Sequence, residues 1–121
     1  MKEQKKEFIT CMDERIADCK QRAMKLSSEG CTEESVFENI RLNIYEIFKT
    51  VFLAAEKSCG EDKTALQNFF LQKLEQIPEN WKISYEKAEK HGDSEKMHIE
   101  KIKLETAQKV REIFEKIYHI V

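Results

Sequence analysis

Helix-breaking residues are scarce: the 121-residue chain contains three glycines and one proline. Because glycine and proline interrupt regular structure, their scarcity leaves little room for many short strands joined by loops. Charged residues make up 36% of the chain, and glutamate, lysine and leucine, which favour helices, are abundant. The composition therefore predicts a single all-α domain, residues 1–121, that is long enough to bury its own core.

Long apolar runs are also missing. The longest, Val51–Ala55, is far too short to cross a membrane. The N-terminal residues, MKEQKKEFITC, lack the apolar stretch of a signal peptide, so we expect a cytoplasmic protein. The cysteines form neither a C-x-x-C pair nor a zinc-ligand spacing, which suits a reducing compartment; they are Cys11, Cys19, Cys31 and Cys59.

An excess of either charge is missing as well. The net charge of −2 arises from 21 lysines and arginines against 23 aspartates and glutamates. The two signs are mixed along the chain, and no segment is strongly basic. Because phosphate backbones and anionic lipids are bound by clustered lysine and arginine, we expect neither a nucleic-acid partner nor a membrane partner.

The segment from Val36 to Ala55 is the richest in apolar residues, with thirteen among its twenty. At about 100° per residue, most of these side chains fall within about half of the helix circumference. An arc this wide suits a central helix with two neighbours in a bundle; it contains Val36, Phe37, Ile40, Ile44, Tyr45, Ile47, Phe48, Val51, Phe52, Ala54 and Ala55. Arg41 interrupts the arc, and its head either binds an anionic ligand or reaches water or a carboxylate at the core edge.

Two leucines of the same helix, Leu42 and Leu53, lie outside the arc and are nearly stacked on its polar side. Single surface leucines are common in monomeric proteins. Two leucines aligned on one face also suit a contact with another protein or with a second copy of the chain. Leu42 and Leu53 are therefore a candidate partner contact, and the chain is a candidate homodimer.

Three further amphipathic segments accompany the central one. Thr32, Asp62 and Asp93 each precede an apolar-periodic stretch and are predicted N-caps. Because the links between the segments are short, we predict an up-down-up-down antiparallel four-helix bundle. Its helices are expected to span about residues 2–28, 33–58, 63–90 and 94–119.

Pro78 lies inside the third segment, where a proline removes one backbone hydrogen bond. The apolar phase nevertheless continues across Pro78 without a slip, and a helix running through it matches the other three in length. We therefore predict one third helix that is kinked at Pro78. The alternative is two short helices that meet at a corner over residues 76–78.

Aromatic residues gather on the second and third segments. Such residues usually form packed core. Helical bundles also hold ligands between their helices, so a small apolar ligand is a second hypothesis. Its cavity would be lined by Phe48, Phe52, Phe70, Trp81 and Tyr85.

Catalytic and cofactor signatures are missing. Glu95 and His98 have the E-x-x-H spacing of di-iron bundles, but no second such motif accompanies them, so a metal-binding bundle is the weakest hypothesis. There is no phosphate loop and no dinucleotide fingerprint, and we expect neither a cofactor nor enzymatic activity. The leading hypothesis is a non-enzymatic helical protein that mediates protein–protein contact or self-association.

Overall fold

In the computed structural model, which describes residues 2–120, helices account for 88% of the chain and no strand is present. This result confirms the all-α prediction. The helices are α1 (Lys2–Ser28), α2 (Thr32–Cys59), α3 (Lys63–Gln76), α4 (Glu79–Lys90) and α5 (Ser94–Ile117).

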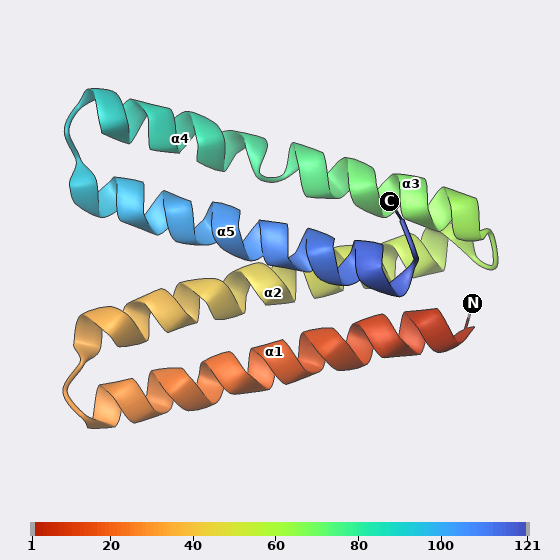
Figure 1. Cartoon of the computed structure of the whole chain (residues 1–121), viewed down its shortest axis with the longest axis horizontal. Helices are drawn as coiled ribbons and strands as arrows, with labels where there is room; N and C mark the ends of the chain where they lie inside the picture. Colours follow the sequence, from red (N-terminus) through yellow and green to blue (C-terminus); the bar gives the residue numbers. More distant parts are fainter. Residues whose placement is uncertain (1, 121) are drawn as a thin grey trace.

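The helices form four antiparallel rods, because α3 and α4 continue one another (Figure 1). The turns at 29–31 and 91–93 lie at one end of the bundle, and the turn at 60–62 lies at the other. α2 packs against α1, α3 and α5, whereas α1 packs mainly against α2 and more sparsely against α5. The prediction of an up-down-up-down four-helix bundle is confirmed.

Aspartates cap two of the helix starts. The side chains of Asp62 and Asp93 each accept a hydrogen bond from the backbone N–H three residues further on, at 3.0 and 3.1 Å. These bonds satisfy amides that a helix start leaves without partners, and they confirm both predicted caps. The predicted Thr32 cap is wrong by one residue, since Thr32 is already helical and Cys31 holds the cap position.

The last helix ends earlier than predicted. α5 stops at Ile117 and not at His119, because His119 adopts a φ of 55°, which lies outside the right-handed helical region. The Ile120 N–H then donates to the Glu115 carbonyl at 2.9 Å, which satisfies one of the carbonyls that a helix end leaves free.

Pro78 interrupts helical hydrogen bonding but hardly changes the direction of the rod. α3 ends at Gln76 and α4 begins at Glu79, with a bend of only 16° between them. Pro78 occupies the N-cap of α4 with a φ of −70°, close to the value that the proline ring fixes. A residue at the start of a helix donates no backbone hydrogen bond within that helix, so α4 loses none at Pro78. The predicted third rod with a kink at Pro78 is confirmed.

Five phenylalanines form the centre of the core. Each is fully buried, and together they come from α1, α2, α3 and α5; they are Phe8, Phe48, Phe52, Phe70 and Phe114. The Phe70 ring lies 4.6 Å from the Phe114 ring and 5.4 to 6.4 Å from the other three. Most of these pairs meet edge to face, the arrangement that aromatic rings prefer.

The two parts of the third rod contribute unequally to the core. α3 buries Leu66, Phe70 and Leu74, whereas Ala88 is the one buried residue within α4. α4 packs mainly against α5, and Trp81 is only half-buried. The rod is therefore anchored in the core through α3.

We expect Phe70→Ala to lower the free energy of unfolding by about 3–5 kcal/mol, because it opens a cavity where four other rings meet. Urea denaturation followed by the fluorescence of Trp81, the single tryptophan, measures this change. Ile83→Ala, at a side chain that is 42% exposed, is the control and should change stability by less than about 0.5 kcal/mol. Similar losses in both variants would contradict a core centred on Phe70.

Tyr118 closes the core beside the end of α5. Its ring stacks on Phe114 with 4.5 Å between centroids. Its hydroxyl is buried and has no hydrogen-bond partner within residues 2–120. Burial, together with the negative charge of Glu56, raises the pKa of Tyr118 to about 12.

This shift predicts a loss of stability at high pH. Because the folded pKa lies above the ordinary value of 10.0, the stabilisation is complete below pH 10 and is lost as the pH rises toward about 12. Tyr118→Phe removes the titrating group. We expect urea denaturation at fixed pH to show a steeper fall in stability over this range for the natural protein than for the variant. Parallel pH profiles would be inconsistent with a buried Tyr118 hydroxyl.

Candidate functional site

The five aromatic residues of the predicted ligand cavity are largely packed together. Phe48, Phe52 and Phe70 are fully buried, and the Trp81 ring meets Phe48 edge-on at 6.5 Å between centroids. Tyr85 is half-buried on α4 and lies outside this cluster. The structure therefore places Phe48, Phe52, Phe70 and Trp81 in core contacts.

The two leucines of the predicted partner contact lie in different surroundings. Leu42 is half-buried and packs against the core, whereas Leu53 is 44% exposed. On the α1 side of α2, Lys49 pairs with Asp13 of α1, and Ser35 donates to the Ala23 carbonyl of α1 at 2.9 Å. Of the two leucines, Leu53 is therefore the one available to a partner.

One edge of the apolar arc of α2 is exposed, which corrects the expectation that the whole arc is buried. Val36 is 47% exposed and Ile47 is 39% exposed, and Ala54 is exposed beside them. The physical reason is that α1 covers the opposite flank of α2, while α3 and α5 cover the middle of the arc. α4 packs mainly against α5, and Val36, Ile47 and Ala54 remain exposed.

This edge continues into a surface that we call the outward strip of α2. All of its side chains are uncharged, and all are exposed except the half-buried Ile40; the strip consists of Val36, Asn39, Ile40, Asn43, Ile47, Thr50 and Ala54. The absence of charge is notable in a chain whose residues are 36% charged. Depletion of charged residues is the compositional feature that distinguishes the centre of a protein–protein interface from ordinary surface.

Exposed apolar side chains are concentrated on the same helix. Among the described residues, three of the five large exposed hydrophobic side chains belong to α2. They are Val36, Ile47 and Leu53; of the other two, Met24 lies on α1 and Ile83 lies on α4. α2 is therefore both the central helix of the core and the helix with the most apolar outer surface.

A groove lies where α1 and α5 pack sparsely. Its volume is about 820 Å³, and Cys11, Ile113 and Ile117 contribute its less polar lining. Charged and polar side chains surround them, with more cations than anions; they are Glu7, Arg15, Lys109, Glu112, Lys116 and His119. The groove can accommodate an apolar chain that carries an acidic group.

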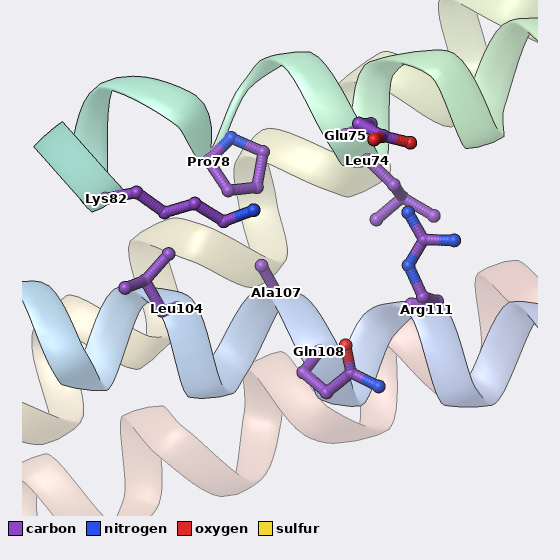
Figure 2. A pocket seen from close by; sticks show the side chains of 8 residues that line it. All are labelled: Leu74, Glu75, Pro78, Lys82, Leu104, Ala107, Gln108 and Arg111. Atoms are coloured by element: carbon purple, nitrogen blue, oxygen red, sulfur yellow. The ribbon is translucent and has the colours of Figure 1, made fainter.

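A smaller hollow of about 380 Å³ lies at the bend of the third rod, beside α5. Figure 2 shows Lys82 extending from α4 beneath Pro78, and Arg111 rising from α5 toward Leu74. Glu75 of the same lining carries the opposite charge. The hollow lies near the lower end of the volumes that ligand sites occupy, which limits it to small ligands.

Arg41 rests on a carboxylate and does not present a free anion site. Its Nη1 atom lies 2.8 Å from Glu38, and Glu38 also pairs with Arg22 of α1 at 3.3 Å. Cys19 lies beside Arg22 and is 1% exposed. Burial and the charge of Glu38 raise the pKa of the Cys19 thiol, which favours the unreactive protonated form.

The residues of the predicted metal motif do not gather further ligands. Glu95 and His98 are both exposed, and the His98 ring meets Phe37 edge-on at 4.5 Å. Within residues 2–120, no three side chains of the histidine, cysteine, aspartate or glutamate type are grouped so that they could hold a metal ion. In the same range, no helix combines the length and the hydropathy needed to cross a membrane.

Comparison with known proteins identifies no relative: no family model, no curated protein and no solved structure matches this chain. Function is therefore inferred from the surfaces of the chain itself. The outward strip of α2 is the candidate functional site, and the groove between α1 and α5 is the second.

Proposed function

We propose that this chain is a non-enzymatic cytoplasmic helical protein that acts by contacting another protein, including a second copy of itself. The observation that supports this proposal is the exposed, uncharged outward strip of α2. Covering exposed apolar side chains such as Val36 and Ile47 with a partner removes them from water, which lowers the free energy of the complex. A surface without charges loses no ionic hydration on binding.

The composition of the strip favours a protein partner over nucleic acid or a membrane. It contains no lysine or arginine, which a phosphate backbone requires. Helices that lie on membranes combine a strongly cationic face with an apolar one, whereas this strip mixes isoleucine and valine with asparagine and threonine. The strip therefore lacks the positive charge that binding to nucleic acid or to a membrane would require.

Association can be tested with one variant inside the strip and one beside it. We expect Ile47→Glu to weaken binding by at least about tenfold, because it places a charge at the centre of the contact. Leu53→Glu, at the margin of the strip, should weaken binding less. Sedimentation velocity over a concentration series measures self-association, and retention on an immobilised chain measures binding of a second protein.

Ile83→Glu is the matched control, since Ile83 is equally exposed but lies on α4. It should bind as the natural protein does, and circular dichroism should show the same helicity in all variants. A chain that is monomeric at every concentration and retains no partner would refute the proposal. Equal effects of Ile47→Glu and Ile83→Glu would exclude the outward strip as the contact.

The groove between α1 and α5 supports a second candidate function, the binding of a small apolar ligand. Ile113 and Ile117 would contact an apolar chain, while Arg15 and Lys116 would pair with an acidic group at its end. This location differs from the predicted aromatic cavity, because the ligand would lie between α1 and α5 and not between α2 and α3.

Thermal unfolding with and without dodecanoate tests this second candidate. We expect the fatty acid to raise the Tm of the natural protein, because a ligand that binds the folded state stabilises it. Ile113→Asp should remove this increase, whereas Ile99→Asp, at another half-buried isoleucine of α5, should retain it. An equal increase with decylamine, which has the opposite charge, would show that the cations of the groove do not select the ligand.

A further inference from the structure

We propose that the outward strip of α2 binds the same strip of a second copy, with the two α2 helices antiparallel about a two-fold axis that passes between Asn43 and Ile47. This inference rests on the proposed function and specifies its partner and geometry. It follows from the spacing of the strip residues, from the pairs that an antiparallel arrangement creates, and from the charges at the two ends of the strip.

The strip has the spacing of a two-helix interface. Ile40, Ile47 and Ala54 are seven residues apart, and a second series, Val36, Asn43 and Thr50, has the same interval. The two series alternate at separations of four and three residues, which is the heptad pattern of paired helices. The core-facing residues of α2, such as Phe48 and Phe52, belong to neither series. α2 therefore carries a second heptad face in addition to the one that faces the core.

An antiparallel arrangement about the proposed axis matches the two series residue by residue. Val36 of one copy faces Ala54 of the other, and Ile40 faces Thr50. Nearest the axis, Asn43 faces Ile47. Each pair combines a branched apolar side chain with a smaller or an uncharged polar one, so the two surfaces interlock without burying a charge.

Continuing each series by one heptad adds a pair of opposite charges. Glu33 lies seven residues before Ile40, and Lys57 lies seven residues after Thr50; both are exposed. In the antiparallel register, Glu33 of each copy faces Lys57 of the other, at both ends of the contact. A parallel register would instead place the two glutamates together and the two lysines together. The Glu33 and Lys57 charges at the ends therefore favour a second copy in the antiparallel orientation.

The helices that pack against α2 leave the strip accessible to a second copy. The strip residues are exposed except for the half-buried Ile40, and the polar contacts of α2 with α1 are made by Ser35 and Lys49, which are not part of the strip. The outward surfaces of the other helices are charged, for example at Glu86 of α4 and at Lys101 of α5. The uncharged strip itself extends about 27 Å, from Val36 to Ala54, at the helical rise.

Reciprocal charge exchange tests both the partner and the register. Glu33→Lys and Lys57→Glu, each alone, convert two attractive end contacts per dimer into two repulsive ones. We expect each single change to raise the dimer Kd by about tenfold, since an exposed pair contributes up to about 1 kcal/mol. The double variant Glu33→Lys, Lys57→Glu should restore the Kd to nearly that of the natural protein. Sedimentation equilibrium at low salt measures these constants, and high salt should reduce the differences.

Glu34→Lys is the matched control. Glu34 lies in the same first turn of α2 as Glu33 and has the same effect on the helix dipole, but it is not part of either heptad series. It should leave the dimer Kd unchanged. These substitutions are at exposed positions, so circular dichroism should show that all variants remain folded.

The possible failures separate this inference from the proposed function. A double variant that binds no better than the single variants overturns the antiparallel register, and so does an equal loss in Glu34→Lys. A natural protein that stays monomeric but binds another protein through Ile47 overturns self-pairing and leaves the proposed function standing. A monomer that retains no partner overturns both.

Discussion

The meeting of five phenylalanine rings at one point is the constraint on which the rest of the fold depends. Phe8, Phe48, Phe52, Phe70 and Phe114 come from four rods, and their rings reach one another only when those rods lie antiparallel at close range. The Phe52 ring of α2 contacts the rings of Phe8, Phe70 and Phe114, so α2 packs against all three of the other rods. The third rod has to run almost straight past Pro78, because α3 supplies the Phe70 ring while α4 continues along α5.

The same constraint explains why α2 retains apolar surface on the outside. A helix that contacts three neighbours through Phe48, Phe52 and Ala55 directs its most hydrophobic side toward the core. The apolar arc of α2 is nevertheless wider than these neighbours cover, so Val36 and Ile47 remain in contact with water. The surplus is confined to a single strip from which charge is absent, and this combination is what a partner protein can recognise.

Local features of the chain could be predicted from its sequence, because they depend on residues close together along it. The caps Asp62 and Asp93, the end of α1 and the shallow bend at Pro78 are examples. Periodicity shows that a face is apolar, but it does not show whether a neighbour covers that face. Val36 and Ile47 were therefore expected in the core, although the heptad series through Ile40 and Asn43 was a signal of a second contact face. The groove at Cys11 and Ile113 depends on residues about a hundred positions apart, and no local pattern could reveal it.

The limited core burial of α4 has a consequence for the dynamics of the bundle. α4 contributes only the buried Ala88 and the half-buried Trp81, whereas α3 buries Leu66, Phe70 and Leu74. Pro78 supplies no amide hydrogen at the junction, so no helical hydrogen bond from that residue ties α4 to the end of α3. Amide hydrogens of α4 should therefore exchange with solvent through local opening, while those of α2 and α3 exchange only when the whole domain unfolds. The domain thus combines a slowly exchanging centre with one helix that can open separately.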